Sequence, residues 1–193
     1  MERKATHGII LAAGLGSRLQ PEEGHKILAE LGGRPLLDYH LDNFRAIGVT
    51  DVTVVTGYQA EDLAEQLHAR QLAGQLTLRT AYNPDFESGN GVSVLAGVEA
   101  GREALEEKAT PFWLTMSDHI FEPGLFATLA EDFAPDRTSE AILCVDRKLD
   151  TIFDMPDANK LAWREGQLVD IGKGLEEFEL VDVGLFWCED GFV

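Results

Sequence analysis

The sequence has few cysteines and no long apolar run, and each shortage excludes a class of protein. Only two cysteines, Cys144 and Cys188, occur in 193 residues, so a disulfide-stabilised secreted scaffold is not indicated. Both lie in apolar, strand-like runs, which favours small buried side chains in a reducing compartment; their number allows one bridge, but no pattern favours it. No apolar run reaches the length of a signal-peptide core or a membrane span. We therefore expect a cytoplasmic protein with no membrane segment in this chain.

Positive charge is also scarce. Sixteen Lys and Arg residues face 34 Asp and Glu residues, which gives a formal net charge of −18. Surfaces that bind nucleic acids or anionic membranes rely on an excess of cations, so we predict no nucleic-acid partner. A well-solvated acidic surface is the simplest interpretation. The length suits one domain with a sizeable core, and we expect a single domain over residues 1–193.

Strand and helix patterns alternate along the first two-thirds of the chain. Strand-like runs are expected at residues 7–11, 52–56, 76–81, 112–116 and 141–145, and later at 160–164, 167–171 and 181–188. Helical spacing is found at residues 35–47, 60–72, 92–105 and 122–133. This alternation predicts an α/β fold, a three-layer α/β/α arrangement with a mostly parallel sheet covered on both faces. In such sheets ligands bind beyond the carboxyl ends of the strands.

The most informative segment is residues 9–26, which reads IILAAGLGSRLQPEEGHK. An apolar strand runs into small residues and glycines, and such a loop brings bare backbone N–H groups to a phosphate. Two cations, Arg18 and Lys26, can neutralise the same anion; solvated loop cations are the alternative interpretation. A dinucleotide-binding fingerprint is incomplete because Leu19 stands in place of the third glycine, and no Gly-Lys-Ser/Thr of a P-loop follows.

The run Leu-Ala-Ala-Gly-Leu-Gly-Ser-Arg, with a lysine eight residues later, resembles the signature of the sugar-phosphate nucleotidyltransferases. Those proteins usually carry a proline before that lysine, where this chain has His25. Residues 87–93, 115–119 and 170–184 together resemble one branch, the inositol-1-phosphate cytidylyltransferases, which make CDP-inositol from CTP. The resemblance covers nearly the whole chain. It implies a Rossmann-like nucleotide-diphospho-sugar transferase fold with a mixed sheet, CTP and a small phosphate ester as substrates, and Mg²⁺ as cofactor.

Site roles follow from this resemblance and from the chemistry of the residues. Asp118 is a hard oxygen donor at the end of a strand and suits Mg²⁺, although a turn or N-cap role would also suit it. The resemblance implies Asp182 as the second metal ligand. Arg18, Lys26 and Asp118 form the expected catalytic set. The expected nucleotide-binding residues are Leu11, Ala12, Ala13, Gly14, Gly16, Ser17, Arg18, Lys26, Glu87, Asn90, Gly91, Ser93 and Asp118.

Within that set, Asn90, Gly91 and Ser93 stand where relatives read the base, and Glu87 would accept a hydrogen bond from an exocyclic amine. Asn90 also suits the N-cap of the following helix. His119 is interpreted as a packing or supporting residue.

On the acceptor side, Arg147, Lys173 and Asp182 are the expected substrate-binding residues. Glycines on both sides of Lys173 permit close approach of a phosphate, which is the favoured role, and an exposed hairpin lysine is the alternative. Arg147, after the fifth strand, is an even choice between a phosphate contact and a surface cation.

The reaction that these residues imply is attack of a phosphate monoester on the α-phosphorus of a nucleotide. The monoester is already an anion, so alignment and charge neutralisation suffice without a general base. We predict transfer of CMP from CTP to myo-inositol 1-phosphate. A choline phosphate or a sugar 1-phosphate is the alternative acceptor, and a non-catalytic nucleotide-binding regulatory module is the alternative of another class.

The resemblance has two further implications for the whole molecule. Relatives usually continue beyond the equivalent of Val193, and some are fused to a membrane-embedded synthase. This leaves open a C-terminally incomplete domain and a homodimer.

Overall fold

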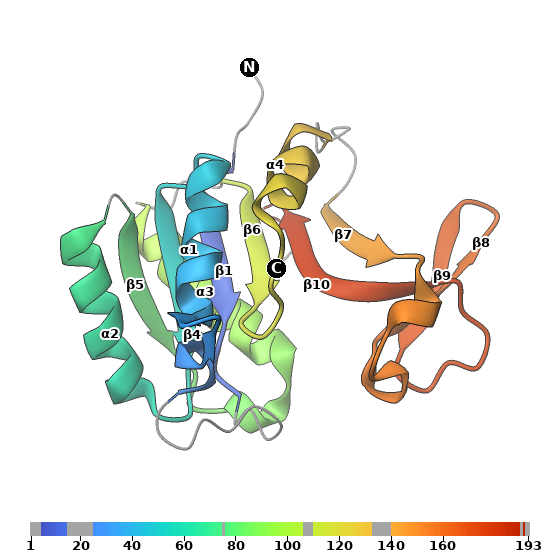
Figure 1. The fold of residues 1–193 in the computed structure, drawn as a ribbon, viewed down its shortest axis with the longest axis horizontal. Coiled ribbons are helices and arrows are strands. Elements are labelled where there is room, and N and C mark those ends of the chain that lie inside the picture. Colours follow the sequence, from blue (N-terminus) through green and yellow to red (C-terminus); the bar gives the residue numbers. More distant parts are fainter. Residues whose placement is uncertain are drawn as a thin grey trace.

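The structure is a computed structural model that describes residues 5–14, 25–74, 76–105, 110–132, 140–189 and 191. It shows a three-layer body with an extension built from its last strands at one side (Figure 1). The α-helices are α1 (Leu36–Ala46), α2 (Ala60–Ala73), α3 (Asn90–Ala104) and α4 (Pro123–Asp132). The strands are β1 (His7–Leu11), β2 (Glu30–Leu31), β3 (Arg34–Pro35), β4 (Asp51–Thr56), β5 (Thr77–Tyr82), β6 (Phe112–Met116), β7 (Ala141–Asp146), β8 (Lys160–Arg164), β9 (Gln167–Gly172) and β10 (Leu180–Cys188). The predicted alternation is confirmed, with boundaries that differ by one or two residues.

One large mixed sheet organises the molecule. Its strand order is β5-β4-β1-β6-β10-β8-β9, and β7 also pairs with β10. β5, β4, β1 and β6 run parallel to one another, whereas β10 runs antiparallel to β6, β7 and β8. The predicted α/β fold class is therefore confirmed.

Alternate side chains of β1 face different helical layers, as the two-residue period of a strand requires. Ile10 joins the core formed with Phe44 of α1 and with residues of α2 and α4. Ile9 faces the opposite layer and packs with Val98 of α3. α3 lies close to β1 because it presents Gly97, whose added Cβ would lie 2.7 Å from Ile9 Cγ2. Helices thus cover both faces of the parallel part of the sheet.

The β8–β9 hairpin turns at Glu165 and Gly166, as predicted. Both residues have positive φ angles, 51° and 80°, which suits a tight two-residue hairpin turn. β10 continues from this extension into the main body (Figure 1). Its start pairs with β8 and its end pairs with β6, so a single strand joins the two parts of the sheet.

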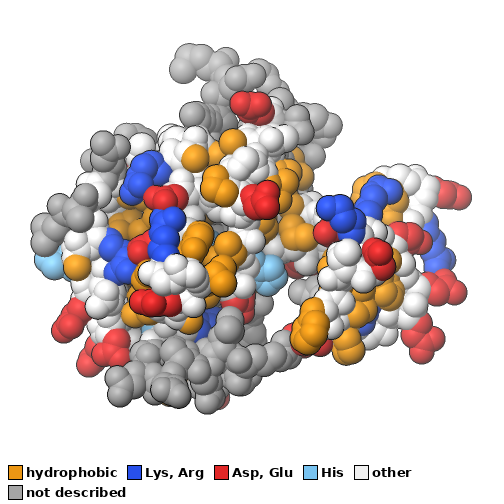
Figure 2. Space-filling view, in the orientation of Figure 1, with side chains coloured by type: hydrophobic (Ala, Val, Ile, Leu, Met, Phe, Trp, Pro, Cys, Tyr) orange, Lys and Arg blue, Asp and Glu red, His pale blue; other side chains and the backbone are white. Residues whose placement is uncertain are grey.

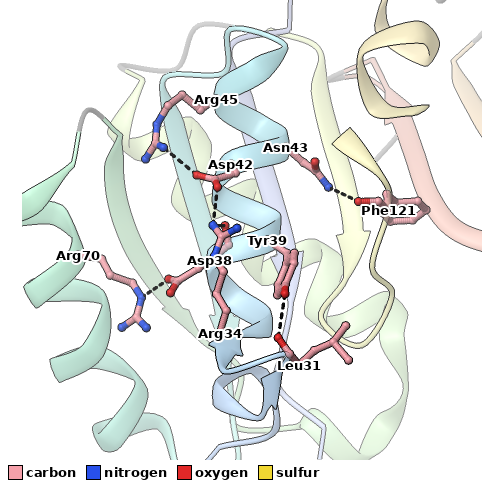
Figure 3. Close-up of polar contacts among 9 residues, drawn as sticks. All are labelled: Leu31, Arg34, Asp38, Tyr39, Asp42, Asn43, Arg45, Arg70 and Phe121. Atoms are coloured by element: carbon pink, nitrogen blue, oxygen red, sulfur yellow. Dashed lines mark hydrogen bonds and ion pairs between the residues drawn. The ribbon is translucent and has the colours of Figure 1, made fainter. Parts of the chain in front are cut away.

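The basic side chains on the outer face of α1 are balanced by acidic ones. Figure 2 shows Lys and Arg side chains gathered here beside carboxylates. Arg45 lies 2.8 Å from Asp42, and Arg70 of α2 lies 2.5 Å from Asp38. Arg34 also pairs with Asp42, as Figure 3 shows. This cluster links α1 to α2 and to β3, and each arginine in it already has an acidic partner.

The cysteines and the apolar content of the helices bear on two expectations from composition, buried reduced thiols and no membrane segment. Cys144 and Cys188 are free and buried, and burial raises the pKa of each thiol to about 12. No helix in the described ranges combines the length and the apolar character needed to cross a membrane.

Candidate functional site

A cavity of about 590 Å³ lies at the carboxyl ends of β1 and β6. This is the sheet edge at which ligand binding was expected. Its lining comes from segments that are far apart in the chain, including the end of β1, the start of α3, the loop after β6 and the first half of β10. The predicted site residues that line it are Leu11, Ala13, Gly14, Lys26, Asn90, Asp118, Lys173 and Asp182.

The loop after β1 contributes only part of its predicted set. Leu11 and Ala13 line the cavity together with Gly14. Ala12 between them is fully buried in the core on the α1 face, and its N–H donates to Val55 O at 2.9 Å. The remaining predicted residues of this loop, Gly16, Ser17 and Arg18, lie outside the described residues.

Lys26 reaches the cavity from a short 3-10 turn, Lys26–Leu28. Its ammonium lies 3.4 Å from Asp118 Oδ2. His25 caps this turn, because its Nδ1 accepts a hydrogen bond from the N–H of Ile27 at 3.3 Å. His25 is 1% exposed, and burial lowers its pKa. A neutral, buried His25 therefore shapes the turn that carries Lys26.

Asp118 follows β6 and projects into the cavity beside His119. His119 Nδ1 lies 3.1 Å from Asp118 Oδ1. This hydrogen bond is the main cause that holds the pKa of Asp118 well below its usual range, and the Lys26 ammonium adds to it. Asp118 is thus a carboxylate at any physiological pH. His119 is half-exposed and lines the cavity, where its ring contacts the Asp118 carboxylate.

Two side chains of α1 make hydrogen bonds to the loop that carries Asp118. His40 Nε2 lies 3.2 Å from the carbonyl oxygen of Ser117, and Asn43 Nδ2 donates to the carbonyl of Phe121 at 3.1 Å (Figure 3). Burial lowers the pKa of His40 to about 4, so its ring is neutral and can donate to Ser117. These two buried residues of α1 hold both ends of the loop.

The same helix also supports the segment that follows Lys26. The Tyr39 hydroxyl donates to the carbonyl of Leu31 at 2.8 Å (Figure 3), and the Arg34 guanidinium lies 4.7 Å from the centre of the Tyr39 ring. α1 therefore makes hydrogen bonds to two segments, the loop that carries Asp118 and the chain that follows Lys26.

Asp182 is placed by an irregularity in β10. The register with β7 shifts between Asp182 and Phe186, and Gly184 has a φ of +71°. The Gly184 N–H donates to Asp182 Oδ1 at 2.6 Å, and Asn159 Nδ2 donates to Oδ2 at 3.4 Å. The bulge thus aims the Asp182 carboxylate into the cavity that Asp118 also lines.

Gly184 is needed here for space as well as for conformation. A Cβ on it would lie 3.1 Å from Cγ of both His119 and Met116. Any larger residue at this position would therefore require His119 or Met116 to shift by a few tenths of an ångström.

On the acceptor side, Lys173 lines the cavity and Arg147 does not. Lys173 Nζ lies 2.7 Å from Asp157 Oδ1, and Asp157 belongs to the same lining. Arg147 is exposed after β7 and is absent from the lining. The structure therefore distinguishes the two predicted basic residues, because only Lys173 lines the cavity.

Of the predicted base-reading residues, only Asn90 lines the cavity. Asn90 is the first residue of α3 and Gly89 is its N-cap, so the N-cap alternative for Asn90 is wrong by one position. Ser93 is buried, and its hydroxyl accepts a hydrogen bond from Asn83 Nδ2 at 2.9 Å. Glu87 and Gly91 are exposed and lie outside the lining.

Comparisons with known proteins identify the family and the fold. The sequence model of the MobA-like NTP transferase domain matches residues 8–157. A curated relative, the bifunctional IPC transferase and DIPP synthase of Rubrobacter xylanophilus, is 32% identical over 187 residues, which cover 96% of this chain and 39% of that protein. The chain spans less than half the length of the curated relatives it matches.

Two solved structures show the same fold. The inositol-1-phosphate CTP transferase from T. maritima matches with a TM-score of 0.79 and 24% identity, over 99% of this chain and 73% of that one. UDP-glucose pyrophosphorylase complexed with UDP-glucose matches with a TM-score of 0.74 and 15% identity, over 97% and 77%. The expected nucleotide-diphospho-sugar transferase fold is confirmed.

Proposed function

Because the chain belongs to the MobA-like NTP transferase domain family, we propose that it is a nucleotidyltransferase that moves CMP from CTP to myo-inositol 1-phosphate. The observation that carries this proposal is the cavity that gathers Lys26, Asp118, Lys173 and Asp182 from separate segments. The choice of CTP and inositol phosphate is supported by the names of a curated relative, an IPC transferase, and of a structural neighbour, an inositol-1-phosphate CTP transferase.

The proposed step needs no general base. An oxygen of the acceptor phosphate bonds to the α-phosphorus of CTP, while the bond from that phosphorus to the bridging oxygen of the β-phosphate breaks and pyrophosphate leaves. Lys26 would neutralise the triphosphate, and Lys173 would hold the acceptor phosphate. The chain's contribution is alignment and charge neutralisation, the main sources of catalysis in phosphoryl-type transfer.

A divalent cation such as Mg²⁺ fits the two carboxylates of the cavity. Asp118 and Asp182 are hard oxygen donors that line the same space, and no group of three or more potential metal ligands occurs among the described residues. Mg²⁺ is usually held by one or two carboxylates together with substrate phosphates and water, which matches this donor set. When bound, the ion would neutralise charge on the reacting phosphates. His119 orients Asp118, and Gly184 and Asn159 orient Asp182.

We also propose that residues 1–193 act as one domain, because β10 pairs with β6 in the body and with β8 in the extension. The roles of Gly16, Ser17 and Arg18 stay predictions, as do the base-reading roles of Glu87, Gly91 and Ser93. The cytoplasmic location and the homodimer also stay predictions.

A pyrophosphate-release assay tests the proposal. CTP is compared with UTP, ATP and GTP, and inositol 1-phosphate with phosphocholine and glucose 1-phosphate, each with Mg²⁺. We expect the highest kcat/KM for CTP with inositol 1-phosphate, its loss in Asp118→Asn and its retention in Glu99→Gln, a change on the exposed side of α3. Preference for UTP or for another acceptor overturns the substrate assignment, and no turnover with any pair overturns the enzyme assignment.

A further inference from the structure

β8 begins with a buried lysine that the proposed reaction does not use. Lys160 is 8% exposed, and its ammonium donates a hydrogen bond to the backbone carbonyl of Lys173. It also lies 5.5 Å from the centre of the Phe178 ring. Within the described residues its partners are thus a carbonyl and a ring and not a carboxylate. Burial of an ammonium without a counter-charge is unfavourable, so packing alone does not account for a lysine here.

Lys160 stands between two residues of the proposed site. Its cross-strand partner on β9 is Gly172, and its partner on β10 is Val181. Each partner directly precedes a cavity-lining residue, Lys173 and Asp182 respectively. The start of β8 is therefore the structural link between the metal side and the acceptor side of the cavity.

The backbone around Lys173 needs such an anchor. Gly172 and Gly174 flank it, and a Cβ on either glycine would have no atom within 4 Å, so side-chain packing at these two positions does not restrain the turn. Glycines on both sides give the backbone wide conformational freedom. The hydrogen bond from Lys160 fixes the carbonyl between them, and it leaves the Lys173 side chain to reach Asp157 in the cavity.

We propose that Lys160 is a positioning residue for the acceptor phosphate, because it holds the Lys173 carbonyl and thereby directs the Lys173 ammonium into the cavity. Lys160 does not itself line the cavity, so it acts through Lys173. The inference rests on the proposed function, since it takes Lys173 as the group that meets the acceptor.

The test is Lys160→Met, which keeps the length of the apolar stem and removes the donor. We expect KM for inositol 1-phosphate to rise about tenfold or more, as loss of a hydrogen bond to a charged group would cause. KM for CTP should stay within about twofold, and Lys160→Arg, which keeps a donor, should recover much of the loss. The matched control is Arg164→Met on the same strand, where the cation makes a surface ion pair with Glu177 at 2.9 Å.

A double variant with Lys173→Ala gives a second, independent reading. If Lys160 acts through Lys173, then Lys160→Met adds nothing to the acceptor KM of Lys173→Ala. Additive effects, an unchanged acceptor KM, or an equal rise in KM for CTP would each overturn the inference. Should Lys160→Met not fold, Lys160→Gln carries the same expectation, because its shorter amide leaves the carbonyl unheld.

The failure of the proposed function would look different. Wild-type protein that does not turn over CTP with inositol 1-phosphate contradicts the function. Calorimetric binding of inositol 1-phosphate then tests Lys160 directly, with the same tenfold weakening expected in Lys160→Met, and an unaltered or absent affinity overturns the positioning role.

Discussion

Gly184 combines an unusual backbone conformation with a close contact, and Gly184→Ala tests how much the site depends on both. Its φ of +71° would cost alanine about 1–2 kcal/mol of folding free energy. The new Cβ would lie 3.1 Å from Cγ of His119, so the residue that supports Asp118 must shift. We expect kcat/KM to fall by about 10–100-fold, because small displacements of aligned groups have effects of this size.

A matched control separates the contact from the backbone strain. Gly166 in the β8–β9 turn has a φ of +80°, and a Cβ there would meet nothing within 4 Å. Gly166→Ala should therefore lose the same 1–2 kcal/mol or so in urea unfolding and keep its full activity in the pyrophosphate-release assay. Wild-type kcat/KM in Gly184→Ala, or an equal loss of activity in both variants, would refute the reasoning.

Three further predictions follow from burial and charge. The pKa of His40 is lowered from 6.5 to about 4 in the folded protein. The unfolded chain therefore binds more protons than the folded protein between these pH values. The free energy of unfolding should fall as the pH drops from 6.5 to 4, by up to about 3 kcal/mol from this residue. Urea unfolding at pH 7, 5.5 and 4 measures how the free energy of unfolding changes with pH. His40→Gln should weaken this pH dependence, and an unchanged pH dependence in the variant contradicts the prediction. Removal of divalent cations with EDTA should abolish turnover, and excess Mg²⁺ should restore it. Asp118→Asn should lower kcat/KM by about 100-fold or more. Turnover that resists EDTA contradicts the metal assignment. Cys144 and Cys188 should react with a thiol reagent only on unfolding, since burial raises both pKa values to about 12, and rapid labelling of native protein contradicts this.

Residues at strand ends were predictable from the sequence because a simple rule places them. Leu11 and Asp118 end or follow parallel neighbouring strands, and the carboxyl ends of such strands share one edge of the sheet. The same two-residue period could have excluded Ala12, which faces the opposite side from Leu11 and Ala13.

Residues that depend on register or on contacts between distant elements were not predictable in this way. Gly184 acts through a bulge that only the pairing of β10 with β7 reveals, and His40 acts through a hydrogen bond 77 positions away in the chain. The sequence of Lys160 and its neighbours is typical of an exposed hairpin lysine, whereas the structure buries it. The sequence indicates its burial in one way: Lys160 directly precedes the apolar residues Leu161 and Ala162 of the strand.

The central claim is that this cavity transfers a nucleotidyl group to a phosphate ester, and ³¹P NMR of a reaction of CTP, inositol 1-phosphate and Mg²⁺ tests it most directly. The account predicts loss of the CTP and monoester signals in equal amounts, with growth of pyrophosphate and of a diester pyrophosphate, CDP-inositol. Unchanged spectra, or CMP and pyrophosphate with the monoester left intact, would contradict it.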